Sequence, residues 1–257
     1  MPTMIRRVVP AGTLPVLHDT VFLQPHTDDA VLSSFALLSR AARCTVVSVF
    51  SGVPAEGVRP VPGGTVPPGM TPRDYMRNRR AEDEAVLRAL GADSVHLDFL
   101  ELQFRDDPDE SGLVDQISQI LRGTLAPSVR TVVCPVGIGG NPNHSQTAAA
   151  LARVAADRGI DTVWCADYPY AALPQWPDWI DGHGAMPPHW GEMLAVAGDN
   201  IECTVVLLDE DLQGAKATSF AGYASQVDAT DRGGERAVTD PSRIRAEVYF
   251  ARPGLLG

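Results

Sequence analysis

The sequence lacks any apolar run that approaches the roughly 20 residues a helix needs to cross a bilayer. The N-terminal segment MPTMIRRVVPAGTLPVL carries two arginines but has no long apolar core and no small-residue cleavage site. We therefore expect no signal peptide, and we expect a cytoplasmic protein.

Positive charge is scarce, with 21 Lys and Arg against 32 Asp and Glu and a formal net charge of −11. Nucleic acids and anionic membranes both favour partners with basic patches. The balance argues against both as partners and leaves a small molecule as the expected ligand. Oligomeric state has no signal in the sequence.

Cysteine is also scarce, and none of the four cysteines forms a CxxC pair. Cys44, Cys134 and Cys203 lie in or beside apolar, strand-like runs. We expect buried free thiols rather than a disulfide framework.

Short β-branched runs alternate with helical patterns along the whole chain, which predicts an α/β fold with a mostly parallel sheet and helices on both faces. No linker divides the chain, so we expect a single domain over 1–257. Gly- and Pro-rich stretches predict irregular loops at 52–73 and 168–200. The predicted strands are 20–24, 44–51, 94–99, 131–136, 161–167, 202–209 and 245–252, and the predicted helices are 30–43, 74–91, 111–126, 145–159 and 211–226.

Polar motifs follow three of the predicted strands. PHTDD follows the strand at 20–24, FRDD follows the strand at 94–99, and GIGGNPNH follows the strand at 131–136. Open parallel sheets bind ligands at the carboxyl ends of their strands. The three motifs should therefore meet at one edge and form a site.

The residue types in these motifs suit a metal centre. His26 and Asp29 lie three residues apart at a strand-to-helix turn, and His144 follows another strand. Two histidines and one carboxylate with an open position are typical of catalytic zinc. Asp28 would then be free to take a proton from water. In the alternative interpretation, Asp28 or Asp29 only caps the next helix, and His144 caps a helix or bonds a backbone carbonyl.

The motifs resemble those of a known family. PHTDDAVLS looks like the PHPDDAVLS/AHPDDE signature of the PIG-L (LmbE-like) zinc-dependent N-deacetylases. The family's later segments have counterparts in the same order in RNRRAEDEAVLRALGA, PVGIGGNPNH, ADYPYA and YASQV. The first motif is fairly specific, and each later one is weak by itself.

The resemblance implies a Rossmann-like three-layer sandwich that hydrolyses an N-acyl group, usually acetyl on an amino sugar. It implies zinc as the cofactor, although the same ligands also suit Fe²⁺ or Co²⁺. By position, it assigns His26, Asp29 and His144 to the metal and Asp28 to the general base. It assigns substrate binding to Arg79 and Asp106.

The chain departs from the family pattern at Asn141 and Asn143, which replace the usual histidine and aspartate of HxDH. Thr27, in place of proline, is a minor third departure. Asn141 can donate a hydrogen bond to an oxyanion, but it cannot act as a general acid at neutral pH. Either Asp28 serves as both base and acid, or His183 or His189 supplies the proton, or the leaving group needs none.

These departures keep two other functions open. One is an amidase acting on a different acyl or thiol conjugate in specialised metabolism, and the other is a metal-binding protein with little catalysis. The tryptophans in 168–200, namely Trp176, Trp179 and Trp190, are interpreted either as a sugar-stacking platform or as packing for the loop.

Overall fold

An eight-stranded sheet forms the centre of the protein, in the order β1-β7-β8-β6-β5-β2-β3-β4. The computed structural model describes residues 6–64, 66–107, 111–170, 176–183, 185–233 and 244–257. Strand β8 runs antiparallel to β6 and β7, and all other neighbours are parallel. The strands are β1 (Arg6–Pro10), β2 (Thr20–Gln24), β3 (Cys44–Ser48), β4 (Asp93–His96), β5 (Thr131–Pro135), β6 (Asp161–Cys165), β7 (Glu202–Leu207) and β8 (Ala246–Ala251).

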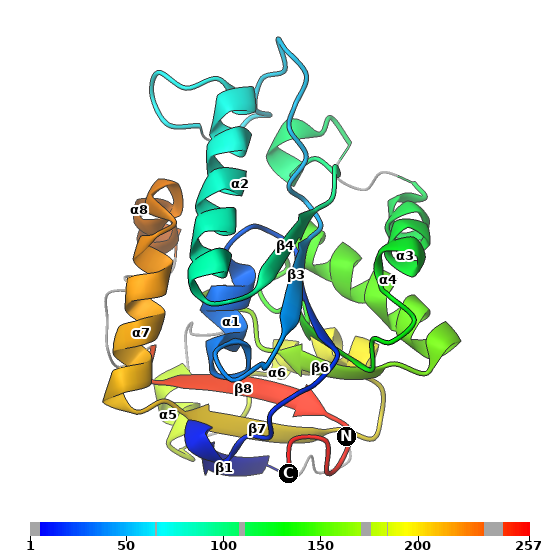
Figure 1. Cartoon of the computed structure of the whole chain (residues 1–257), viewed down its shortest axis with the longest axis vertical. Coiled ribbons are helices and arrows are strands. Elements are labelled where there is room, and N and C mark those ends of the chain that lie inside the picture. Colours follow the sequence, from blue (N-terminus) through cyan, green and yellow to red (C-terminus); the bar gives the residue numbers. More distant parts are fainter. Residues whose placement is uncertain (1–5, 65, 108–110, 171–175, 184, 234–243) are drawn as a thin grey trace.

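Helices cover both faces of this sheet. Helices α1, α2, α7 and α8 lie on one side, and α3 and α4 pack together on the other (Figure 1). The α/β three-layer arrangement predicted from the alternating pattern is confirmed. The helices are α1 (Asp29–Leu38), α2 (Pro72–Ala89), α3 (Leu113–Thr124), α4 (Pro142–Arg158), α5 (Trp176–Ile180), α6 (Pro188–Met193), α7 (Glu210–Ala221) and α8 (Ala224–Gly233), with short 3₁₀ turns at Ala11–Thr13, Leu102–Phe104 and Leu194–Ala197.

The chain order of the sheet reverses between β2 and β5, its central parallel pair. Every residue of both strands is buried, as expected for strands covered on both faces. Thr20, Val21 and Phe22 pair in register with Thr131, Val132 and Val133. The segments that follow these strands therefore leave the sheet side by side, at the point where α/β folds bind ligands.

The structure departs from the prediction in one unpredicted strand and in two predicted elements. Strand β1 is absent from the prediction because its five residues, RRVVP, are half exposed at the sheet edge and show no buried run. The helix predicted at 211–226 is broken between α7 and α8, where Tyr223 turns into the core. The region 168–200 is not wholly irregular, because α5, α6 and a 3₁₀ turn lie within it.

Tryptophans of the region 168–200 belong to the core. The rings of Trp179 and Trp190 are both buried with centroids 5.4 Å apart, and Trp190 also meets Phe250 of β8 at 6.3 Å. This packing favours the structural interpretation over a sugar platform for these two residues. The side chain of Trp176 lies outside the described residues.

The four cysteines are free and buried, as predicted. Within the described part of the chain, no helix combines the length and apolar character required to cross a membrane. The cytoplasmic location stays a prediction.

Candidate active site at the carboxyl ends of β2 and β5

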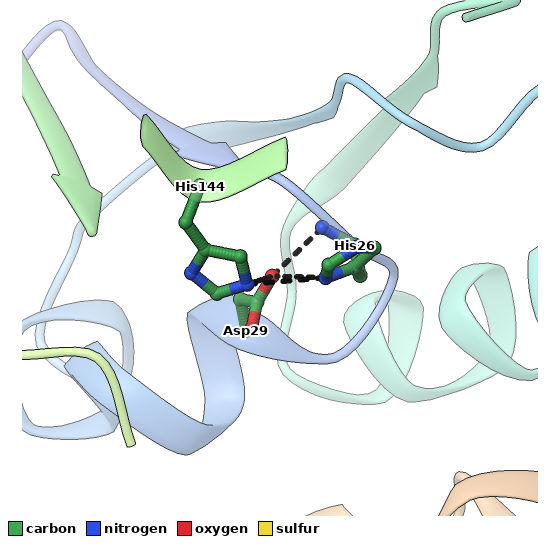
Figure 2. A group of neighbouring side chains, drawn as sticks. All are labelled: His26, Asp29 and His144. Carbon is green, nitrogen blue, oxygen red and sulfur yellow. Dashed lines mark hydrogen bonds and ion pairs between the residues drawn. The ribbon is translucent and has the colours of Figure 1, made fainter. Parts of the chain in front are cut away.

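Three of the predicted site residues converge where β2 and β5 end (Figure 2). His26 follows β2, Asp29 begins α1, and His144 lies in the first turn of α4. Asp29 Oδ2 lies 3.3 Å from His26 Nδ1 and 3.4 Å from His144 Nε2, and these two nitrogens are 3.1 Å apart. The ligand atoms all lie within 4.8 Å of one another, so the group could hold a metal ion.

The structure does not support the interpretation of the two aspartates as helix caps. Asp28 occupies the N-cap position of α1, but its side chain makes no capping hydrogen bond. Asp29 Oδ2 accepts a 2.7 Å hydrogen bond from the backbone N–H of His26. The backbone N–H of Ala30 donates to Gln24 Oε1 at 3.0 Å. The Gln24 side chain thus caps a backbone N–H at the start of α1. Neither aspartate side chain is used as a cap.

Asp167 orients the His144 ring through the nitrogen that faces away from Asp29. Asp167 belongs to the ADYPYA segment, but the sequence alone does not assign it a role. His144 Nδ1 lies 2.5 Å from Asp167 Oδ1, and Asp167 Oδ2 accepts hydrogen bonds from the backbone N–H groups of Gly137 and Ile138 at 2.8 and 2.7 Å. Burial opposes the charged form of His144, but Asp29 and Asp167 outweigh it and raise the pKa to about 9. A neutral His144 that donates from Nδ1 directs its Nε2 lone pair at Asp29.

His26 has a different partner, Asn143. Arg105 Nη2 donates to Asn143 Oδ1 at 2.6 Å, so the Nδ2 group of this amide faces His26 Nε2 at 2.9 Å. Because Nδ2 can only donate, Nε2 accepts, and the proton of a neutral His26 ring then lies on Nδ1. The replacement of the family's aspartate by Asn143 therefore changes the tautomer that this environment favours.

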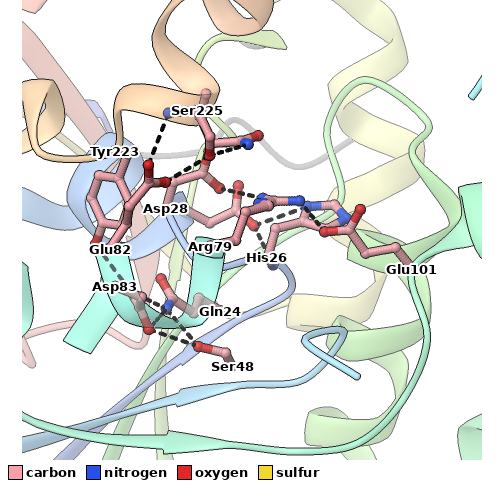
Figure 3. A network of polar contacts seen from close by, with 12 residues as sticks. Gln24, His26, Asp28, Ser48, Arg79, Glu82, Asp83, Glu101, Tyr223 and Ser225 are labelled. Carbon is pink, nitrogen blue, oxygen red and sulfur yellow. Dashed lines mark hydrogen bonds and ion pairs between the residues drawn. The ribbon is translucent and has the colours of Figure 1, made fainter. Parts of the chain in front are cut away.

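Asp28 lies beside the cluster in a group of buried charges (Figure 3). Arg79 of α2 places Nη2 3.6 Å from Asp28 Oδ1, and its Nη1 forms a short ion pair with Glu101. Burial raises the pKa of Asp28 to about 6, although Arg79 partly offsets this shift. Burial also acts to raise the pKa of Asp29, but His144 and His26 outweigh it, and the net shift is downward.

The site contains one pocket of about 240 Å³. Its lining includes His26, Asp28, Asp29 and Arg79, so the structure brings these four predicted residues together. Asp106 is exposed and does not line the pocket. Glu101, five residues before Asp106, is the carboxylate of this segment that lines the pocket. Glu101 Oε2 also accepts a hydrogen bond from Gln103 Nε2 at 2.7 Å. The substrate-binding role of Asp106 finds no support in this arrangement.

Asn141 lies at the N-cap of α4, where its side-chain oxygen accepts a 3.0 Å hydrogen bond from the backbone N–H of Asn143. Its side chain also hydrogen bonds Tyr170, which lines the pocket and meets the His144 ring edge-on at 5.7 Å. His183 and His189, the alternative proton donors, are exposed and are absent from the pocket lining.

A buried polar network lies beneath the site and also escaped sequence reasoning (Figure 3). Asp83 of α2 is fully buried and accepts hydrogen bonds from Gln24 Nε2 at 3.2 Å, Ser48 Oγ at 3.3 Å and Tyr223 O–H at 3.0 Å. His96 Nε2 lies 2.8 Å from Asp83 Oδ2, the oxygen that also accepts from Ser48. Asp83 thus connects three neighbouring strands to the turn before α8, and through Gln24 it reaches the start of α1.

The fold and the site define a Rossmann-like α/β protein with a His–Asp–His cluster at the switch point of its sheet. The PIG-L family model, described as GlcNAc-PI de-N-acetylase, matches residues 21–155, which is more than half of the chain, and the chain belongs to this family. No curated protein shows significant sequence similarity to it.

Solved deacetylase structures share the fold. The A40926 pseudoaglycone deacetylase Dbv21 is 27% identical with a TM-score of 0.64, over 90% of this chain and 96% of that one. The zinc-inhibited form of teicoplanin deacetylase Orf2 is 21% identical with a TM-score of 0.68, over 91% and 97%. The N,N'-diacetylchitobiose deacetylase from Pyrococcus horikoshii is 17% identical with a TM-score of 0.53, over 92% and 84%.

Proposed function

We propose that the protein is a metal-dependent N-deacylase that removes an acyl group, most simply acetyl, from the nitrogen of an amino-sugar-containing small molecule. The observation that carries this proposal is that Asp28 lines one pocket together with His26 and Asp29, which form a cluster with the buried His144. The family description supports an N-acetylated sugar as the substrate class, and the 27%-identical deacetylase supports deacetylation.

The donor set fits zinc. Ligand bonds of roughly 2.0–2.1 Å in a tetrahedron separate the ligand atoms by about 3.3 Å. The three separations here are 3.1, 3.3 and 3.4 Å, and two imidazoles with one carboxylate are a zinc donor set. To bind through Nδ1, the His26 ring would carry its proton on Nε2, a tautomer that the Asn143 amide disfavours. The same N and O donors accept Fe²⁺ or Co²⁺. When bound, the ion would lower the pKa of a water molecule and polarise the acyl carbonyl.

Asp28 acts as the general base. With a pKa of about 6, the carboxylate is ionised at neutral pH and still basic enough to accept a proton from the attacking water. As the tetrahedral intermediate collapses, the C–N bond breaks and Asp28 returns this proton to the leaving nitrogen. The products are a free amine and a carboxylate. No second acid is needed, which agrees with the exposed positions of His183 and His189.

Asn141 and Arg79 assist without a proton transfer. Asn141 does not line the pocket itself, but it hydrogen bonds Tyr170, which does. We assign its amide to the developing oxyanion, a type of contact worth about 10²–10³ in rate where it has been measured. Arg79 lies between Asp28 and Glu101, so it orients the base with one nitrogen and holds the pocket carboxylate with another. Glu101, Arg79 and Gln103 then offer charged and polar contacts to the sugar.

The test uses purified protein loaded with one equivalent of zinc, and the assay measures amine release. The panel pairs N-acetylglucosamine derivatives with N-acylated thiol conjugates, and Asp28→Asn serves as the matched variant. Preferred release from the sugars, lost in the variant at unchanged zinc content, supports the proposal. Faster release from the thiol conjugates would show that these, and not amino sugars, are the substrate class. One bound zinc with no hydrolysis of any amide would leave a metal-binding protein instead.

A further inference from the structure

One wall of the pocket comes from α8, far in sequence from the metal cluster. Ala229 and Thr230 lie three and four residues after Gln226, so both are on the same face of the helix as Gln226, and all three line the pocket. Sequence reasoning quoted YASQV only as a weak late motif and gave these residues no role. The mechanism above does not use them.

Helix α8 is fixed to α2 by hydrogen bonds at its start (Figure 3). Glu82 accepts hydrogen bonds from the backbone N–H of Ser225 at 3.0 Å and from its hydroxyl at 2.6 Å. Two residues before Ser225, the Tyr223 hydroxyl donates to Asp83. Tyr75 and Arg79 of α2 also line the pocket. The hydrogen bonds between α2 and α8 therefore fix the positions of these two pocket walls relative to each other.

Gln226 and Tyr75 form a preoriented polar pair across these walls. Gln226 Nε2 donates to the Tyr75 hydroxyl oxygen at 2.8 Å and to Ser225 Oγ at 2.9 Å, which uses both of its protons. Its Oε1 remains as an acceptor. Since the Tyr75 oxygen accepts from Gln226, its own O–H is left to donate, and no acceptor for that O–H is found among the described residues. Both side chains are more than nine-tenths buried.

We propose that Tyr75, Gln226 and Thr230 form a subsite for the hydroxyl groups of the ring that carries the N-acyl nitrogen. A hydroxyl both donates and accepts, so it matches an acceptor and a donor held side by side. The three side chains are neutral, whereas the charged groups of the pocket already pair with one another. An apolar ring would leave these buried groups unpaired, which disfavours its binding. The subsite rests on the proposed function.

The experiment compares two amides on zinc-loaded protein: N-acetylglucosamine and N-cyclohexylacetamide, which is the same acetamide on a ring without hydroxyls. The variants are Gln226→Leu, Tyr75→Phe and Thr230→Val, each close in size to the original. Asp228→Asn, exposed on the same helix and outside the pocket, is the control. We measure kcat/KM for both amides and, independently of turnover, their binding by ligand-observed NMR.

We expect each pocket variant to lower kcat/KM for the sugar by about 3- to 10-fold through KM, with the cyclohexyl amide and the control unchanged within about twofold. Equal losses on both amides, or no loss on either, would overturn the subsite. If wild-type protein hydrolyses neither amide, the deacylase proposal fails separately. In that case the binding measured by NMR tests the subsite. The subsite is supported if wild type binds the sugar more tightly than the cyclohexyl amide and the variants lose this preference. It is refuted if wild type shows no such preference.

Discussion

Replacing Asp167 by asparagine should weaken metal binding without touching a ligand. Asp167 Oδ2 accepts from the backbone N–H groups of Gly137 and Ile138, and Oδ1 faces His144 Nδ1. An asparagine can keep its oxygen on the two backbone donors only if its NH₂ group faces His144. That NH₂ donates to Nδ1, so the imidazole proton moves to Nε2, the atom that faces Asp29 and His26.

The structure also sets the size of the effect. Turning the amide around would leave two buried backbone donors facing an NH₂ group, at about 1–3 kcal/mol each. Moving the His144 proton to Nε2 costs less than turning the amide around. We therefore expect the variant to hold His144 in the tautomer that cannot bind metal through Nε2. Substitutions of partners behind a metal ligand typically reduce affinity 10- to 100-fold, or about 1.4–2.7 kcal/mol. We expect a loss of zinc affinity in this range.

Zinc affinity is measured by competition with a chromophoric chelator. The His144 tautomer is measured by ¹⁵N chemical shifts in metal-free protein above pH 9, where the ring is neutral. Glu247→Gln is the control, because Glu247 is a buried carboxylate that accepts from the backbone N–H groups of Phe35 and Ala36 at 2.9 Å, away from the ligands. Since Glu247 also pairs with the buried Lys216, circular dichroism checks that this variant is folded. Its zinc affinity should not change. If Asp167→Asn binds zinc as tightly as wild type while His144→Ala does not, the tautomer argument is refuted.

Other substitutions separate the remaining roles. Asp28→Asn should lower kcat about 10²- to 10⁴-fold with zinc content unchanged, as measured by amine release and mass spectrometry. Glu101→Gln should lower kcat/KM while Asp106→Asn leaves it unchanged in the same assay, and the reverse would restore Asp106 to the site. Asn143→Asp should raise zinc affinity roughly tenfold, because a carboxylate would accept from His26 Nε2 and free the Nδ1 lone pair. Asp83→Asn should lower the free energy of unfolding by about 2–4 kcal/mol in urea titrations, since it leaves buried donors poorly paired.

The sequence predicts the centre of the fold well because one physical rule governs it. Strands buried on both faces read as continuous β-branched runs, and β2 and β5 are of this kind. Once both are placed in a parallel sheet, the residues after them must meet at one edge. The proximity of His26, Asp29 and His144 follows from topology alone and needs no knowledge of side-chain packing.

The walls of the pocket could not be predicted in the same way. Glu101 and Asp106 both follow β4 in a segment without periodicity, and the side chain that turns inward depends on a short 3₁₀ turn and on contact with Arg79. The contact between Asp83 and Tyr223 joins residues 140 positions apart. Such pairs depend on how α2 and α8 dock, which local pattern does not encode.

The adjacent carboxylates Asp28 and Asp29 explain why one short motif can hold both a ligand and a base. They are chain neighbours, yet their surroundings move their pKa values in opposite directions, since the two histidines lower that of Asp29 and burial raises that of Asp28 to about 6. Groups separated in this way take different chemical roles. The strand-to-helix turn makes the separation possible, because it directs Asp29 to the histidines and Asp28 to Arg79 on α2. Each carboxylate thus has its own neighbours, the two histidines at Asp29 and Arg79 at Asp28, and a bound cation would stabilise the charge of Asp29 directly.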